Sequence, residues 1–157
     1  MTRRFTDRGA AFEKWVEKLY DELGKLNVKR DVRKLKGTKH GDVRSQFDVV
    51  YGLVSKTYVE CKYHEEDGKV PLQDVSTFAA KLKLHGIPTR KGVMVTNMEY
   101  DTRARAYARK KGITLVDRDR LARMDWRRSH QLRAYVSHPP ARFRRTLEDR
   151  IKAYERT

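Results

Sequence analysis

The first apolar pattern along the chain has the period of an α-helix. Between residues 7 and 24 apolar side chains recur every three or four positions, and Gly24 supplies a stop signal. We therefore expect a helix over residues 7–24 with one face turned toward the core. The apolar positions of that face are Phe12, Trp15, Val16, Leu19, Tyr20 and Leu23.

Two later stretches alternate apolar and polar residues with the period of a β-strand. Residues 46–51 alternate in this way, and residues 57–63 do so again after a turn that begins at Gly52. Residues 27–36 are mixed in character and are predicted to form a first, highly charged strand. The polar run GTKHGD, at 37–42, is predicted to be a loop.

The second half of the chain alternates helical and strand patterns. Pro71 suits the first position of a helix, and the run GVMVT is apolar throughout, as expected of a central strand buried on both faces. Such alternation implies crossover connections and a mixed sheet covered by helices on both sides, which is an α/β fold. The predicted elements are helix 71–85, strand 92–96, helix 101–111, strand 113–117 and helix 117–124.

The composition changes near the end of the chain. From residue 118 onward there are twelve Lys and Arg against five acids, with aromatic residues interleaved, and a proline pair precedes a final helix predicted over 141–156. We interpret this segment as an appendage to the core. The predicted organisation is a core over residues 1–124 and a basic, Arg-rich helical extension over residues 125–157.

Charge is the strongest signal in the composition. The 157 residues include 37 Lys and Arg against 21 Asp and Glu, a net charge of +16 that attracts polyanions. Nucleic acid is the first expected partner, because Lys and Arg contacts to phosphate supply most non-specific affinity. No apolar run is long enough to cross a membrane, the first residues lack the apolar segment of a signal peptide, and the chain has one cysteine. We therefore expect a cytoplasmic protein without a membrane partner.

Three charged residues interrupt the two strand patterns in FDVVYGLVSKTYVECKY. Glu60 and Lys62 are two apart, so on a strand they share a face about 7 Å apart, and Cys61 between them points to the opposite, apolar face. Asp48 is expected to point away from Phe47 and Val49 on the preceding strand. If the two strands pair as a hairpin, the three charged side chains converge.

Two carboxylates with space between them suit a hard cation such as Mg²⁺, for which Mn²⁺ can substitute. Such an ion polarises a phosphate oxygen and activates a water, while Lys62 can orient that water or stabilise the transition state. Asp48 and Glu60 are therefore the candidate metal ligands of a phosphodiesterase site. The alternative interpretation is an ordinary ion pair at a solvated strand edge, which contributes under about 1 kcal/mol.

The order of these motifs resembles the PD-(D/E)xK nuclease superfamily, and within it the Mrr-like type IV restriction endonuclease catalytic domain. The resemblance runs from about Gly9 to Met124. It is carried by GAAFEKWVEKLYDELG, FDVV, YVECKY, KVPLQDVSTFAAKLKLHG and GVMVTNMEYDTRARAYARKKGITLVDRDRL. It implies a restriction-endonuclease-like mixed sheet in the order α-β-β-β-α-β-α-β, flanked by helices, and a Mg²⁺-dependent DNA endonuclease.

The resemblance also implies roles for individual residues. Asp48, Glu60 and Lys62 match the family's catalytic motif, Glu13 matches the acid of its first helix, and Gln73 opens the helix that follows the hairpin. For Glu13 and Gln73 a solvated polar residue is the alternative. The family's glycines before the Asp are missing here, so Asp42 in the HGD sequence is a rival ligand to Asp48.

The expected partners are duplex or branched DNA and a second copy of the chain in a homodimer. No glycine-rich phosphate loop is present, so no nucleotide cofactor is expected. Two alternatives stay open: a Holliday-junction resolvase-type nuclease, and a non-catalytic nucleic-acid-binding module that works through the basic extension. For His40 a solvated loop histidine also remains an alternative. The side chains predicted to contact nucleic acid are Lys36, Lys39, His40, Arg44, Arg127 and Arg128.

Overall fold

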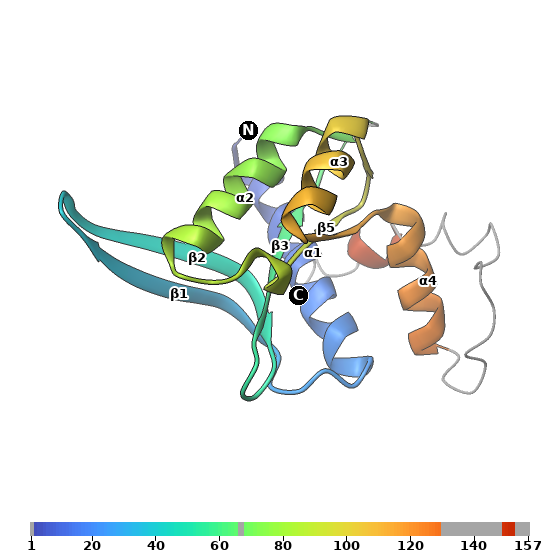
Figure 1. Cartoon of the computed structure of the whole chain (residues 1–157). Helices are drawn as coiled ribbons and strands as arrows, with labels where there is room; N and C mark the ends of the chain where they lie inside the picture. Colours follow the sequence, from blue (N-terminus) through green and yellow to red (C-terminus); the bar gives the residue numbers. More distant parts are fainter. Residues whose placement is uncertain (1, 66–67, 130–148, 153–157) are drawn as a thin grey trace.

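The computed structural model describes residues 2–65, 68–129 and 149–152 of the chain. Helices cover a mixed sheet from both sides (Figure 1). In chain order the elements are α1 (Thr2–Glu22), β1 (Lys29–Thr38), β2 (Gly41–Tyr51), β3 (Thr57–Lys62), β4 (Lys69–Val70), α2 (Leu72–Leu84), the 3₁₀ turn η1 (Thr89–Lys91), β5 (Gly92–Thr96), β6 (Glu99–Tyr100), α3 (Thr102–Lys111), β7 (Thr114–Val116) and α4 (Arg118–Ser129).

The main sheet has five strands in the order β1-β2-β3-β5-β7. The first three strands pair antiparallel, and β5 and β7 then add parallel to β3, with α2 and α3 in the crossovers. The predicted mixed α/β sheet of the restriction-endonuclease-like fold is therefore confirmed. The structure adds β4 and β6, which pair parallel in a second small sheet. Strands of two residues are too short for their periodicity to be visible in a sequence.

Two hydrophobic clusters lie on the two faces of the main sheet. Helices α2 and α3 pack over one face, where Phe78 and Met94 are buried, and α1 and α4 pack over the other, where Trp15 and Leu121 are buried. Strand β5 lies between them, and all five of its residues are buried. The prediction that GVMVT forms a central strand buried on both faces is confirmed.

Helix ends follow the local chemistry of the sequence where capping groups are present. The Asp101 side chain accepts a hydrogen bond from the Ala104 backbone N–H at 2.6 Å, which starts α3, and Gly112 ends it in a left-handed conformation with φ +77°. Helix α4 extends five residues beyond the predicted end at residue 124. Trp126, which is 9% exposed, lies in the added turn, so burial of its ring extends the helix.

The prediction of a loop over residues 37–42 is wrong. Strands β1 and β2 continue to a tight turn at Lys39 and His40, which Gly41 closes with φ +113°. Residues 33–46, which we call the arm, extend away from the sheet beyond α2 (Figure 1). Most of the arm is exposed on both faces. Neither face buries apolar side chains, so the alternation that predicts a strand is absent from its sequence.

The C-terminal extension is described only in part. Arg150 donates hydrogen bonds from one guanidinium nitrogen to both carboxylate oxygens of Asp125 in α4, at 3.2 and 3.0 Å. Most of the helix predicted over 141–156 lies outside the described residues, so a separate extension over residues 125–157 stays a prediction. Among the helices of the described residues, none combines the length and the apolar character needed to span a membrane.

Candidate active site

The two candidate acids meet where the pairing of β2 with β3 stops. The last paired residues are Val49 and Val59, and Asp48 and Glu60 occupy the next positions of the same register. The Asp48 side chain spans the gap, because its Oδ2 accepts a hydrogen bond of 2.7 Å from the Cys61 backbone N–H. The hairpin that the sequence predicted therefore forms, and it brings these two acids to one place.

Strand β2 changes the face toward which its side chains point at Asp48. Phe47 packs in the cluster under α2, whereas Val49 packs in the cluster under α1, so the expectation that they share a face is wrong. The pairing of β1 with β2 is interrupted at the same point, between Asp31 and Asp48, and Asp31 has φ +63°. The physical reason is this local distortion of both strands, which reverses the order of inward and outward side chains. Cys61 lies with the α1 cluster, as predicted.

The Asp48 carboxyl lies in a setting that opposes its ionisation. Burial is the largest cause that raises its pKa from 3.8 to about 7, and the neighbouring carboxylates of Glu60 and Glu13 raise it further. The Cys61 backbone N–H and the Lys81 ammonium act in the opposite direction. Acids crowded at a half-buried site leave the metal-free protein with unfavourable negative charge, which a bound cation can offset.

Two lysines contact the Glu60 carboxylate. The Lys81 ammonium lies 2.5 Å from Glu60 Oε2 and also donates to the Gln46 backbone carbonyl at 2.7 Å, while the Lys62 ammonium lies 3.7 Å from Glu60 Oε1. Lys81 comes from α2, and its side chain is 20% exposed. Sequence analysis did not identify it. Its position three residues after the buried Phe78, at the edge of the helix's apolar stripe, was the available signal.

The two secondary candidates differ in their placement. Glu13 is half-buried on α1, and burial followed by the charge of Asp31 raises its pKa, with a smaller contribution from Glu60. Glu13 therefore belongs to the same electrostatic cluster as Asp48. Gln73 is exposed in the first turn of α2, and its side chain has no hydrogen-bond partner among the described residues.

The donor atoms fit a hydrated magnesium ion better than a closed metal cage. Within residues 2–65, 68–129 and 149–152, the His, Cys, Asp and Glu side chains form no group of three or more that could hold a metal. Magnesium usually keeps several waters and binds one or two carboxylates together with substrate phosphate. Asp48 Oδ1 accepts no hydrogen bond from a described residue, so it remains available as such a ligand. Glu60 offers a second carboxylate, which is shared with Lys81.

The side chains predicted to contact nucleic acid fall into two groups. Lys36, Lys39, His40 and Arg44 all lie on the arm, whose last residue, Gln46, precedes Asp48 by two positions. Asp42, the rival ligand, also lies on the arm, six residues from Asp48 and hence about 20 Å along the strand. It does not share a site with Glu60.

The other group lies on α4. Arg127 is exposed on this helix, whereas the Arg128 guanidinium lies 3.2 Å from a Glu22 carboxylate oxygen, contacts Asp125 and stacks over Trp15. Arg128 is thus held by neighbours within the protein. The proposed DNA contacts therefore do not include Arg128.

Comparison with protein families identifies one that covers most of the chain. A family model described as a restriction endonuclease, Mrr_cat, matches residues 6–124. Among curated proteins no match to the sequence was found.

Three solved structures are similar to the chain at low sequence identity, and the first of them shares its fold. A crystal structure of a protein of unknown function, AF1548, superposes with a TM-score of 0.64 at 19% identity and covers 90% of this chain and 79% of that one. Protein VC1899 from Vibrio cholerae gives 0.49 at 16% identity, covering 91% of this chain and 33% of that one. The DNA modification-dependent restriction endonuclease AspBHI gives 0.46 at 18% identity, covering 90% and 35%. The chain thus spans about a third of each of the last two proteins.

Proposed function

Because the chain belongs to the Mrr_cat family of restriction endonucleases, we propose that it is a Mg²⁺-dependent endonuclease that hydrolyses phosphodiester bonds in DNA. One observation carries the assignment of the site. Asp48 and Glu60 come from adjacent antiparallel strands and meet at the point where those strands stop pairing, close enough for the charge of Glu60 to raise the pKa of Asp48. Two neighbouring acids whose mutual repulsion raises a pKa in this way are typical of a functional site rather than of a structural ion pair.

The proposed roles follow from the positions of the side chains. Asp48 and Glu60 would hold the magnesium ion, Asp48 through its available Oδ1. When bound, the ion supplies polarisation of the phosphate and acidification of a water. The Lys62 ammonium, 3.7 Å from Glu60 Oε1, donates a hydrogen bond to the attacking water or to a phosphate oxygen. Lys81 neutralises Glu60 and positions its carboxylate toward β2.

The arm is the proposed DNA-contacting element next to this site. It carries five Lys and Arg against a single Asp, and its exposed strands form a two-stranded ribbon. A ribbon of this kind is narrow enough to enter the major groove of duplex DNA. Since Asp48 lies at the base of the arm, a duplex bound along the arm passes beside the two acids. Lys36, Lys39, His40 and Arg44 are the phosphate contacts that we propose on it.

Cleavage assays on the purified chain test the proposal. Supercoiled plasmid, linear duplex, single strands and a four-way junction are incubated with Mg²⁺, with Mn²⁺ and with EDTA. We expect metal-dependent cleavage that falls at least about a thousandfold in Asp48→Ala, Glu60→Ala and Lys62→Ala, because each removes a group placed at the reacting phosphate. Metal-dependent cleavage that survives all three substitutions would falsify the assignment.

Binding measured in EDTA provides the control for these variants. All three are expected to bind duplex as well as the parent protein within a few-fold, since phosphate contacts on the arm supply the affinity. A Lys36→Gln/Lys39→Gln variant should bind more weakly and show a shallower salt dependence, whereas Arg103→Gln/Arg109→Gln on α3 should show less change. Binding without cleavage under any condition would favour the non-catalytic module. A strong preference for the junction would favour the resolvase-type activity.

Assembly and location stay predictions. A homodimer is expected from the resemblance to related nucleases, and sedimentation of the full chain with and without DNA measures it. Cytoplasmic location is likewise expected from the sequence, and fractionation of cells that express the protein tests it.

A further inference from the structure

A cavity lies on the α1 face of the sheet, away from the two acids. It is bounded by the end of α1, the end of β2, the first residues of β5 and β7, and α4, and it has a volume of about 510 Å³. Tyr20 follows Glu13 by seven residues on α1, which places this cavity about 10 Å along the helix from the candidate active site. We call it the α1–α4 pocket. Its volume lies in the range of small-molecule sites and far exceeds that of an inorganic anion.

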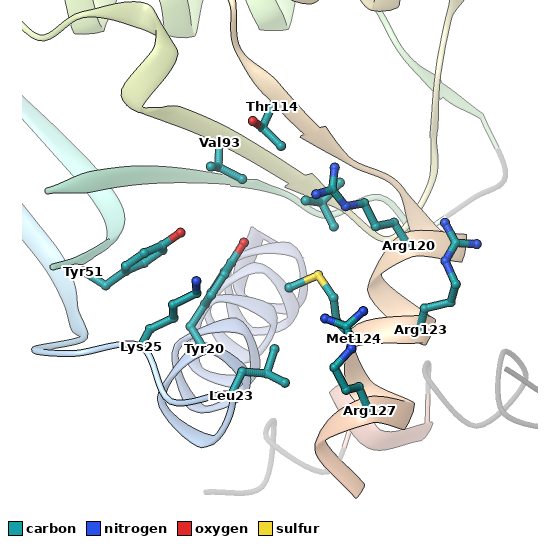
Figure 2. Close-up of a pocket in the computed structure, with 11 residues that line it drawn as sticks. Tyr20, Leu23, Lys25, Tyr51, Val93, Thr114, Arg120, Arg123, Met124 and Arg127 are labelled. Atoms are coloured by element: carbon teal, nitrogen blue, oxygen red, sulfur yellow. The ribbon is translucent and has the colours of Figure 1, made fainter. Parts of the chain in front are cut away.

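Four cationic side chains line the α1–α4 pocket, and no carboxylate does. Lys25 comes from the α1 side, while Arg120, Arg123 and Arg127 come from α4 on the opposite side (Figure 2). Within the part of the chain that the structure describes, none of the four forms an ion pair with an acid. The one hydrogen bond that the Arg120 guanidinium donates to a described residue goes to the Leu115 backbone carbonyl, at 3.3 Å.

The neighbouring Arg128 shows that this arrangement is not a general property of α4. Its guanidinium is paired with Glu22 at 3.2 Å and with the buried Asp125, and Arg128 is not among the residues that line the pocket. Acidic side chains therefore do pair with an arginine of α4, but none of these acids lines the pocket. Cations gathered in a concave site without counter-charges favour an anionic ligand.

The rest of the pocket is aromatic and apolar. The Tyr20 and Tyr51 rings stack with centroids 5.0 Å apart, and the Lys25 ammonium lies 5.5 Å from the centre of the Tyr51 ring. Figure 2 shows Lys25 beside the tyrosine pair and the Met124 thioether facing the rings from α4. Burial raises the pKa of the Tyr20 hydroxyl, so it stays protonated and can donate a hydrogen bond. No described residue accepts one from it.

We propose that the α1–α4 pocket binds a nucleotide through a terminal phosphate. The phosphate contacts Arg123 and Arg127, and the base lies against the tyrosine pair and Met124. Arginine forks match phosphate oxygens, and a planar base matches the aromatic and apolar surface. The same chemistry is offered by a free nucleoside monophosphate and by the 5′-phosphorylated end of a nucleic-acid strand. The site is separate from the two acids and does not depend on the proposed nuclease function.

Calorimetric titration of the full chain in EDTA tests the proposal, because cleavage then plays no part. The first probes are thymidine 5′-monophosphate, adenosine 5′-monophosphate, the two unphosphorylated nucleosides and inorganic phosphate. We expect the monophosphates to bind at least tenfold more tightly than the nucleosides or phosphate. Arg123→Gln/Arg127→Gln should weaken them about ten- to a hundredfold, as expected for lost charge-assisted hydrogen bonds.

The matched control is Arg103→Gln/Arg109→Gln, which removes two exposed arginines from α3 and changes the net charge equally. It should alter nucleotide affinity less than about twofold. The proposal is overturned if both variants weaken nucleotide binding equally. It is also overturned if inorganic phosphate binds as tightly as the nucleoside monophosphates do. Thermal melting of both variants verifies that they are folded. Loss of binding in a folded pocket variant alone supports the site.

A second experiment distinguishes a free nucleotide from a phosphorylated strand end as the ligand. It compares a DNA hairpin that carries a 5′-phosphate with the same hairpin that carries a 5′-hydroxyl. Tighter binding of the phosphorylated hairpin, lost in the pocket variant and competed by the mononucleotide, assigns the pocket to strand ends. Binding of the free nucleotide without any preference for the phosphorylated hairpin assigns it to a soluble nucleotide. If neither the free nucleotide nor the phosphorylated end binds in a way that depends on Arg123 and Arg127, the proposal is wrong.

Discussion

The candidate active site and the α1–α4 pocket both contain cations, but only the first supplies its own anions. At the site, Lys81 and Lys62 lie against Glu60, and Asp48 and Glu13 add further negative charge. In the pocket, Lys25 and the arginines of α4 line a cavity that no acid enters. The two regions therefore favour ligands of opposite charge. A metal cation would neutralise the negative charge of the site, and an anionic ligand would neutralise the positive charge of the pocket.

Substitution of Asp48 should produce the largest effect on the free energy of unfolding. The folded-state pKa of Asp48 is raised from 3.8 to about 7 by burial and then by Glu60, so between these values the folded protein holds a proton that the unfolded chain has released. The metal-free protein therefore loses stability as pH rises through this window. Asp48→Asn removes the loss and keeps an oxygen for the Cys61 N–H, so at about pH 8 it should be more stable than the parent by up to about 4 kcal/mol.

Urea unfolding in EDTA measures this difference. Near pH 4 the advantage of Asp48→Asn should shrink, because the carboxyl is then largely protonated in the folded state. Asp42→Asn, on the exposed arm, is the control and should change stability little at either pH. An advantage that is the same at both pH values would contradict the proposed electrostatic origin.

Removal of the Lys81 ammonium, which neutralises Glu60 at the candidate active site, should have the next largest effect on stability. Lys81→Met keeps an unbranched side chain at this position but removes the ammonium that lies over the Phe78 ring, and it leaves the Glu60 carboxylate without its closest cation. The free energy of unfolding in EDTA should fall by about 1–2 kcal/mol. Mg²⁺ should bind about five- to tenfold more tightly, because the ion no longer competes with the ammonium.

Isothermal titration with Mg²⁺ and urea unfolding measure the two consequences of Lys81→Met. Lys83→Met, on the exposed side of the same helix, makes the same chemical change away from the site. If both variants alter Mg²⁺ affinity equally, Lys81 acts only through the net charge of the protein.

Removal of a cation from the α1–α4 pocket should have the smallest effect on stability. Its direction should be opposite to the loss expected for Lys81→Met. Arg127→Gln relieves repulsion among side chains that have no acid near them, so stability should stay within about 0.5 kcal/mol of the parent or rise slightly. Thermal unfolding at low and high salt measures it, since screening should remove any gain. A clear loss of stability at low salt would show that Arg127 has a structural partner, and the contrast between the two regions would then fail.

Part of the candidate site was predictable from the sequence because its determinants are local. Period-two alternation placed Glu60 and Lys62 on one face of a strand and Cys61 on the other, and the structure agrees. Gly52 indicated the turn that pairs β2 with β3. The central strand β5 was visible as a run of apolar residues. Each of these features depends on residues within a few positions of one another.

Other features could not be predicted because they depend on contacts between distant segments. Lys81 reaches Glu60 across 21 positions of sequence, and only the packing of α2 on the sheet defines that contact. The reversal of faces at Asp48 depends on a distortion shared with Asp31 on another strand. The arm lacked a strand pattern because it has no buried face. The α1–α4 pocket depends on the distance between two helices that lie at opposite ends of the chain.

The sequence alone therefore determined the α/β class, most of the elements and which acids and lysine form the candidate catalytic motif. These follow from side-chain period, turn residues and composition, which act over short distances along the chain. Only the tertiary structure decided which charges are compensated. Burial and the approach of side chains from other elements set that balance, and no local pattern in the chain encodes it.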